Sequence, residues 1–169
     1  LVRELFGHHL RGEVVVPVHR GEPRRMRNAA KAWHAATDSH PNSEGARRLG
    51  LRTVDAEGLS RFLYGAADAT IILDPEAHPF LASEEALQLL RVGPTITFAR
   101  REHPVTGAAA WILPVASLAG NEGTFTSSTG TVQRFAAAFA PHAEARPLWA
   151  TLALLARETG AAALDFRSA

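Results

Sequence analysis

The sequence predicts an α/β fold with a Rossmann-like parallel sheet flanked by helices. Three short runs rich in β-branched and apolar residues, at 69–74, 94–99 and 108–115, have the length and composition of strands. They are mainly apolar, which is typical of parallel strands covered on both faces. The 169 residues also give room for one domain whose core needs no disulfide or metal.

The first fifty residues predict helices around one short strand. Residues 1–10 carry apolar residues at helical spacing. The β-branched run at 13–18 predicts a strand, which Pro17 restricts to a strand end or a sheet edge. Residues 24–37 are rich in alanine and are predicted to be helical, ending at a turn.

Capping residues mark the helices that follow. Asn42 or Ser43 is expected to begin a short helix that ends at Gly50. Asp55 is expected to cap a helix over residues 56–67, and Ser83 a helix over 84–92 that opens with two glutamates. The latter helix separates the strands at 69–74 and 94–99, so a right-handed crossover should place Ile71 and Ile96 in parallel neighbours.

The last third predicts one more strand, a turn-rich segment and a final helix. Trp111 lies in the run at 108–115 and is expected to be buried in the parallel sheet. Residues 123–135 alternate and contain many turn formers, and Pro147 begins a helix that reaches residue 160. We expect at least four strands in all.

Composition excludes several classes of site. The chain has no cysteine, which excludes disulfides, thiolate zinc sites and cysteine-ligated iron-sulfur clusters. It has no apolar run of the roughly 20 residues that cross a bilayer, and no leader pattern. Because it begins at Leu1 and its only methionine is Met26, we expect it to be a fragment of a longer polypeptide.

Basic residues are concentrated in the first third of the chain. Residues 1–52 contain ten basic and five acidic residues, although the net charge of the whole chain is +1. Such an asymmetry is compatible with a phosphate-binding or nucleic-acid-binding face. No aromatic residues interleave the arginines, as a single-strand binder would require, so a solvated or subunit-contacting face is the favoured interpretation.

The common motifs of small-molecule chemistry are missing. There is no GxGxxG, no GxSxG, and no glycine before Lys31, the only lysine. His8 and His9 are adjacent and would point in different directions on a helix, and no HxxxH or HExxH is present. No metal site is predicted.

The acidic residues have structural explanations of their own. Asp74 ends a predicted parallel strand, where α/β proteins place ligand-contacting groups, but Asp74-Pro75 is also a typical turn. Asp68 and Glu122 are interpreted as turn residues, because no partner for acid-base chemistry accompanies them. A nucleotide or cofactor-binding module that uses the strand ends at Asp74 and Arg100 remains an alternative.

Four segments carry a resemblance to a known family: residues 42–51, 67–79, 108–133 and 144–160. The third is the most specific, with the words ILP and EGTFT followed by Gly130, Val132 and Gln133 in the family's order and spacing. Arg146, Pro147 and Trp149 then match its helix entry. The chain resembles the molybdopterin-oxidoreductase fold, and specifically the G-subunit family of bacterial NADH-quinone oxidoreductases (respiratory complex I).

Three positions depart from the family's pattern. Where the family has Asn, Glu and Arg, this chain has Ser127, Thr129 and Thr131. A pocket for a phosphorylated pterin would be expected to keep guanidinium and amide donors. The departures therefore favour a degenerate scaffold over an active molybdenum enzyme of the formate dehydrogenase or nitrate reductase type, which is the second interpretation.

The resemblance implies that the chain is the C-terminal part of the molybdopterin-oxidoreductase-like region of such a subunit. It would form a single α/β domain over residues 1–169, with a Rossmann-like core at 1–115 and a turn-rich segment and C-terminal helix at 116–169. The resemblance also implies a scaffold in an assembly that passes electrons from NADH to quinone. We expect no catalytic, cofactor-binding or metal residues here, and iron-sulfur clusters upstream in the parent chain.

The same resemblance implies a set of partners and a location. The partners are other subunits of the peripheral arm of complex I, with no nucleic acid and no direct membrane insertion. The location is cytoplasmic, peripheral to the inner face of the cell membrane. The isolated fragment is expected to be able to form a homodimer through apolar faces that its natural neighbours would cover.

Overall fold

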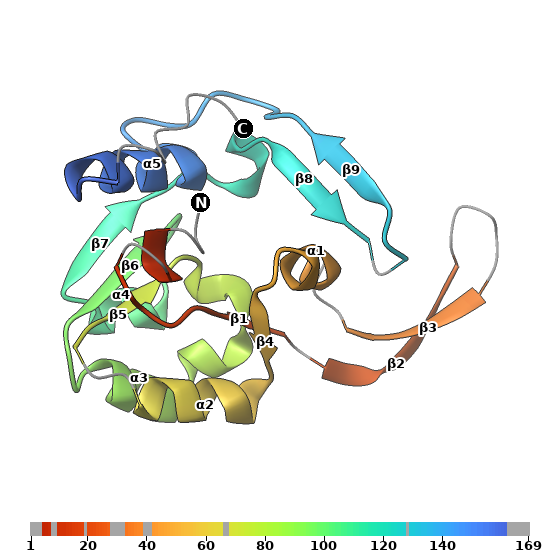
Figure 1. The fold of residues 1–169 in the computed structure, drawn as a ribbon, viewed down its shortest axis with the longest axis horizontal. Helices are drawn as coiled ribbons and strands as arrows, with labels where there is room; N and C mark the ends of the chain where they lie inside the picture. Colours follow the sequence, from red (N-terminus) through yellow and green to blue (C-terminus); the bar gives the residue numbers. More distant parts are fainter. Residues whose placement is uncertain are drawn as a thin grey trace.

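A computed structural model describes residues 5–7, 10–18, 20–27, 33–38, 42–65, 68–127 and 129–161. Its centre is a three-stranded parallel sheet in the order β5 (Thr70–Ile72), β6 (Thr95–Ala99), β7 (Trp111–Pro114) (Figure 1). Ile71 lies opposite Ile96 in parallel register, which confirms the predicted parallel pairing of the two strands.

Three helices cover one face of this sheet: α2 (Ala56–Tyr64), α3 (Glu84–Leu90) and α4 (Pro104–Ala108). Ile72 of β5 packs into a buried cluster with residues of these helices and of the 3-10 turn η3 (Pro79–Ala82). The hydroxyls of Thr95 and Thr97 are buried, and they donate to the carbonyls of Leu90 and Ile72 at 2.9 and 3.4 Å.

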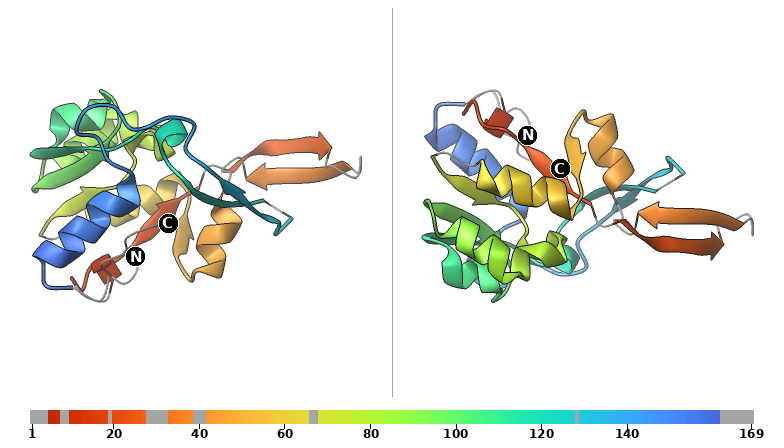
Figure 2. Two further views of the ribbon diagram at one scale, coloured as in Figure 1. Left: turned by 90° about the horizontal axis from the view of Figure 1, so that it is seen from above. Right: turned by 90° about the horizontal axis from the view of Figure 1, so that it is seen from below.

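The opposite face is covered by α5 (Leu148–Glu158) and residues 5–7 (Figure 2). Its core contains Leu5, Phe98 and Leu152, each at most 2% exposed. Ile71 packs on this face while its neighbour Ile72 packs on the other, as the two-residue period of a strand requires. A parallel sheet with helices on both faces is the α/β architecture predicted from the sequence.

Helix ends follow the predicted capping residues. The side chain of Asp55 accepts a hydrogen bond from Gly58 N at 3.0 Å, and that of Ser83 accepts one from Ala86 N at 3.2 Å. The final helix α5 begins after Pro147 as expected. The short α4 between β6 and β7 is not predicted, because five residues are too few to establish a helical period.

A second parallel pair lies beside this sheet. β1 (Val15–Pro17) confirms the first predicted strand, and it pairs with β4 (Arg52–Val54), which is not predicted from the sequence. With three residues, β4 is too short to form a recognisable pattern. The helix predicted at 1–10 lies partly outside the described residues; within them, Leu10 N donates to Leu5 O at 2.9 Å, a single π turn.

The helix predicted over residues 24–37 is wrong. The described parts form an antiparallel pair, β2 (Arg20–Arg27) and β3 (Trp33–Asp38), which projects from the body in both views of Figure 2. Alanine content is a weak predictor that tertiary context overrides. A helix beginning at Arg24 would also place three arginines against the positive end of its own dipole.

A second antiparallel hairpin is formed by β8 (Gly123–Thr126) and β9 (Val132–Phe135), after the 3-10 turn η4 (Leu118–Gly120). The rings of Phe125 and Phe135 stack with centroids 4.9 Å apart. The hairpin contacts α1 (Ser43–Arg48), whose predicted capping residue has a different role: the Asn42 side chain accepts from Thr126 N at 2.8 Å and makes no cap hydrogen bond.

The predicted burial of Trp111 is also wrong. Trp111 is 59% exposed and its neighbour Ile112 is 51% exposed on β7, which is one of the two edge strands of the parallel sheet. A strand pattern alone does not distinguish an edge strand from a central one.

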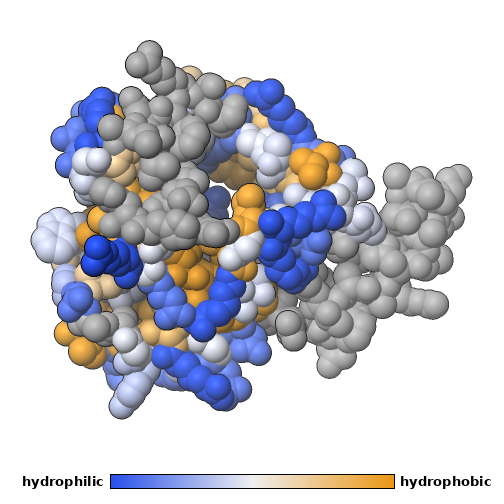
Figure 3. Space-filling model, viewed as in Figure 1, coloured by the Kyte–Doolittle hydropathy of each residue, from blue (hydrophilic) through white to orange (hydrophobic). Residues whose placement is uncertain are grey.

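In the face drawn in Figure 3, hydrophobic residues show mainly in the middle, surrounded by hydrophilic ones. No helix among the described residues is long and apolar enough to cross a membrane.

Candidate functional site

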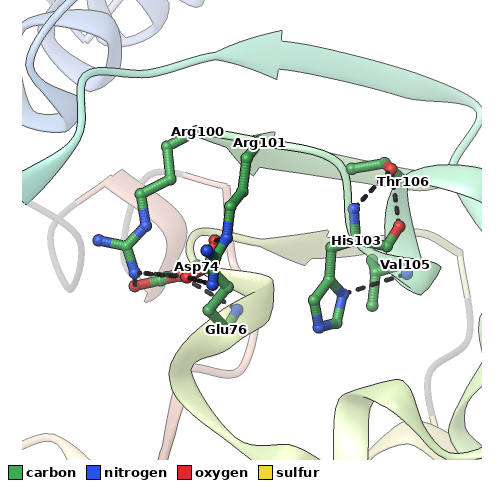
Figure 4. Close-up of polar contacts among 7 residues, drawn as sticks. All are labelled: Asp74, Glu76, Arg100, Arg101, His103, Val105 and Thr106. Atoms are coloured by element: carbon green, nitrogen blue, oxygen red, sulfur yellow. Dashed lines mark hydrogen bonds and ion pairs between the residues drawn. The ribbon is translucent and has the colours of Figure 1, made fainter.

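Four charged residues gather at the carboxyl edge of the parallel sheet, and we call Asp74, Glu76, Arg100 and Arg101 the strand-end cluster (Figure 4). The two acidic residues follow β5 and flank Pro75, which begins the 3-10 turn η2 (Pro75–Ala77). The two arginines come directly after β6. Because β5 and β6 are parallel neighbours, their carboxyl ends meet at one edge.

The two guanidinium groups converge on the two carboxylates. Arg100 Nη2 lies 3.3 Å from Asp74 Oδ2 and 3.2 Å from Glu76 Oε2, so one arginine joins both acids. Arg101 binds Glu76 through two nitrogens, with Nε 2.7 Å from Oε1 and Nη2 2.9 Å from Oε2. Two positive charges therefore meet two negative charges, and the cluster is neutral.

Local backbone contacts fix the position of both acidic residues. Asp74 Oδ1 accepts a hydrogen bond from Glu76 N at 3.1 Å, which caps the 3-10 turn and holds the two carboxylates on the same loop. The Glu76 side chain is 16% exposed. Its burial disfavours the charged form, but hydrogen bonds from Arg101 and the charge of Arg100 outweigh that cost, and the pKa of Glu76 is lowered from its ordinary value.

Two histidines lie in the loops beside the cluster and serve the backbone. His78 is 3% exposed, and its Nδ1 accepts a hydrogen bond from Phe80 N at 3.1 Å. The Nδ1 of His103 caps α4 by accepting a hydrogen bond from Val105 N at 3.2 Å. In return, His103 N donates a hydrogen bond to Thr106 Oγ1 at 3.2 Å (Figure 4). The Nδ1 atoms of both rings are thus used in helix capping.

The described residues hold no group of three or more His, Cys, Asp or Glu side chains that could bind a metal ion.

Asp74 and Arg100 were proposed from the sequence as strand-end residues, and the structure brings these two together. Glu76 and Arg101 were not identified as members of the site. The signal available was their spacing: each lies within two residues of a proposed site residue and just after a strand.

The other acidic candidates lie elsewhere. Asp68 lines a hollow of about 340 Å³ at the amino end of β5, together with the exposed side chains of Tyr64 and Val92. Glu122 pairs loosely with Arg134 across the β8–β9 hairpin, at 3.8 Å. His8, His9 and Lys31 lie outside the described residues.

Two hydroxyl groups in the turn of the β8–β9 hairpin, those of Ser127 and Thr129, contact one another. Ser127 Oγ lies 2.9 Å from Thr129 Oγ1 and accepts from Thr131 N at 3.1 Å. Gly130 has a φ of +86°, and its carbonyl accepts from Arg48 Nη1 of α1 at 3.0 Å. At the three positions that depart from the family's pattern, this chain has Ser127, Thr129 and Thr131, which share hydrogen bonds within the turn. The turn also contacts α1 through the hydrogen bond from Arg48 to Gly130.

The basic first third is described only in part. At β2 and β3 the structure describes the backbone alone. Of the arginines with described side chains, Arg47 and Arg48 pair with Glu44, and Arg52 pairs with Glu13 at 2.5 Å. Each of these three guanidinium groups already contacts a carboxylate, although the three share only two, Glu44 and Glu13, so they are only partly available to a polyanion.

Two curated proteins are similar to this chain. They are the G subunits of the NADH-quinone oxidoreductases of Pseudomonas putida and Pseudomonas fluorescens, each 32% identical over 101 residues. The aligned part is 59% of this chain and 11% of each relative. No family model matches the chain. The similarity confirms the predicted resemblance to these G subunits, and the chain spans only about a tenth of the length of these relatives.

Proposed function

We propose that this chain is the molybdopterin-oxidoreductase-like region of the G subunit of an NADH-quinone oxidoreductase, and that it acts as a scaffold without a cofactor of its own. In this role it supports an assembly that passes electrons from NADH to quinone, located at the cytoplasmic side of the membrane and peripheral to it. The observation that carries the proposal is the similarity to two curated G subunits over 101 residues, joined to an α/β body.

The strand-end cluster supports the absence of a cofactor. The carboxyl edge of a parallel sheet is where α/β proteins bind ligands. Here Arg100 and Arg101, the donors best suited to a phosphate group, are bound to Asp74 and Glu76 of the same chain. The turn around Ser127 adds to this argument, because the Ser127 hydroxyl is already engaged by Thr129 Oγ1 and Thr131 N.

The exposed edge of the sheet supports contact with neighbouring subunits. Trp111 and Ile112 are large, apolar and more than half exposed on β7. Exposed aromatic residues on an edge strand are typical of surfaces that a partner covers. We propose that another subunit of the peripheral arm covers this edge, and that in its absence two copies of the fragment associate through it.

Two experiments test the absence of a cofactor. Calorimetric titration of the purified chain with guanine dinucleotides and with NADH is expected to give no binding tighter than about 1 mM, which corresponds to about −4 kcal/mol. Metal analysis of the same preparation is expected to give no stoichiometric molybdenum, tungsten or iron. Either a stoichiometric metal or a tighter dinucleotide would contradict the scaffold and favour an active molybdopterin oxidoreductase.

A nucleotide or cofactor-binding module is the second candidate, and the position of Asp74 and Arg100 at the carboxyl edge favours it. The two candidates differ in what Arg100→Gln does. In a binding module the substitution should weaken the titrated ligand, whereas a scaffold has no ligand to lose. The matched control is Arg61→Gln on α2, where the arginine is 77% exposed and pairs only with a neighbouring turn of its own helix.

A further inference from the structure

One pair of the strand-end cluster, Arg100 with Glu76, is more sheltered than the ion pairs on the helices, whereas Asp74 is 43% and Arg101 72% exposed. The pair between Arg100 and Glu76 joins side chains that are 29% and 16% exposed, whereas the pair between Arg61 and Glu57 joins side chains that are 77% and 75% exposed. An exposed pair contributes little and exchanges freely with solvent. Glu76 is therefore the sheltered centre of the cluster, and Asp74 and Arg101 lie at its exposed rim.

The arrangement of donors in this cluster is that of an oxyanion site. Arg101 presents two nitrogens in parallel to the two oxygens of Glu76, the bidentate geometry in which a guanidinium binds a carboxylate or a phosphate. Arg100 approaches the same carboxylate from its other side and reaches Asp74 as well (Figure 4). Two guanidinium groups thus meet at Glu76, and one of them also reaches Asp74, at the edge of the sheet where α/β proteins bind ligands.

We propose that this edge is an oxyanion site that the chain fills with its own side chains, so that the carboxylates of Asp74 and Glu76 occupy the positions of a phosphate-type ligand between Arg100 and Arg101. Removing the two negative charges frees the guanidinium groups to bind an external oxyanion. This goes beyond the scaffold role, because a scaffold requires neither converging guanidinium groups nor a latent ligand.

The lowered pKa of Glu76 agrees with this geometry, because it means that the carboxylate stays ionised and competes with any external anion at neutral pH. Asparagine and glutamine keep the shape of the two acids and can still accept hydrogen bonds through their amide oxygens. The double variant Asp74→Asn/Glu76→Gln therefore removes charge while leaving the loop its hydrogen-bonding groups, including the acceptor for Glu76 N.

The test is calorimetric titration with inorganic pyrophosphate of four proteins: the unchanged chain, Asp74→Asn/Glu76→Gln, the same variant with Arg100→Gln and Arg101→Gln added, and the control Glu57→Gln/Glu84→Gln. The control removes the same two charges from side chains that are 75% and 71% exposed on helices. We expect the first variant to bind pyrophosphate about tenfold or more tightly than the control does, a difference of about 1.4 kcal/mol, and the added arginine substitutions to abolish the gain.

Two outcomes would overturn the proposal. In one, the control gains as much affinity as the cluster variant, which would mean that net charge alone drives binding. In the other, the gain persists without Arg100 and Arg101. Circular dichroism establishes that each variant is folded; if the double variant is not, Glu76→Gln alone carries the test, with a smaller gain expected and no gain counting against the proposal. Binding of a cofactor by the unchanged chain would contradict the proposed scaffold function. The comparison of pyrophosphate affinities among the variants tests only the proposal that Asp74 and Glu76 fill an oxyanion site.

Discussion

Truncation of Phe98 and of Trp111 should have very different effects on stability, although both residues lie on strands of the same sheet. Phe98 of β6 is 1% exposed and belongs to the buried cluster between the sheet and α5. Replacing a buried phenylalanine with alanine removes its burial and leaves a cavity, at a typical cost of about 3–5 kcal/mol. Because small domains are stable by only about 5–15 kcal/mol, Phe98→Ala should bring this chain close to unfolding.

Trp111 buries about two fifths of its surface, since it is 59% exposed. A fully buried tryptophan buries about 150–250 Å² of surface, so Trp111 buries roughly 60–100 Å². At about 25 cal/mol per Å² this is at most about 1.5–2.5 kcal/mol, and the value is an upper estimate because unfolded chains are partly compact. No enclosed cavity forms at an exposed edge, so Trp111→Ala should cost about 1–2 kcal/mol.

The assay is urea unfolding of both variants followed by circular dichroism, since Trp111 cannot serve as its own fluorescent probe once it is replaced. The free energies should differ by about 2 kcal/mol, with equal slopes against urea. Equal destabilisation by the two substitutions would contradict the exposure of the Trp111 side chain on β7. If β7 is covered by another subunit as proposed, Trp111→Ala should also reduce the amount of assembled complex, while leaving the isolated chain folded.

Two further predictions concern the polar contacts. Gly130→Ala should destabilise the chain by about 1–2 kcal/mol, because φ is +86° and an added Cβ would lie 2.3 Å from Arg48 Nη2; urea unfolding measures this, and Gly107→Ala, where a Cβ meets nothing within 4 Å, is the control. Glu76→Gln should cost about 1 kcal/mol at pH 7. Because the folded-state pKa of Glu76 is lowered, its contribution is present above the ordinary value of about 4.3 and is lost as the pH falls through the folded-state pKa, so the unfolding free energies of variant and unchanged chain should converge in acid. A difference that persists there would contradict the ion-pair explanation.

Local signals in the sequence were sufficient for much of the fold. The β-branched runs, the caps at Asp55 and Ser83 and the crossover rule together predicted the parallel pairing of β5 and β6. These features are short-range, because a cap or a strand pattern depends on a few neighbouring residues. The pairing of β4 with β1 depends on contacts far apart in the sequence, and the antiparallel pairing of β2 with β3 depends on tertiary context.

The candidate site was predictable in its place and only partly in its members. The rule for parallel sheets placed Asp74 and Arg100 at a shared edge. It did not predict that Glu76 would lie beneath both arginines, because this depends on the turn that begins at Pro75 and on side-chain packing. Exposure of Trp111 was likewise beyond a strand pattern, since the position of a strand within its sheet is a property of the whole fold.

The scaffold role is tested most directly by turnover per assembled enzyme. The complete polypeptide that contains this region would carry Asp74→Asn or Arg100→Gln, and NADH-to-quinone activity in membranes would be divided by the amount of assembled complex. We predict a ratio within about twofold of the unchanged enzyme, a barrier change of about 0.4 kcal/mol. A fall of about tenfold or more with assembly unchanged, about 1.4 kcal/mol of barrier, would show that the strand-end cluster takes part in the reaction and would contradict the scaffold.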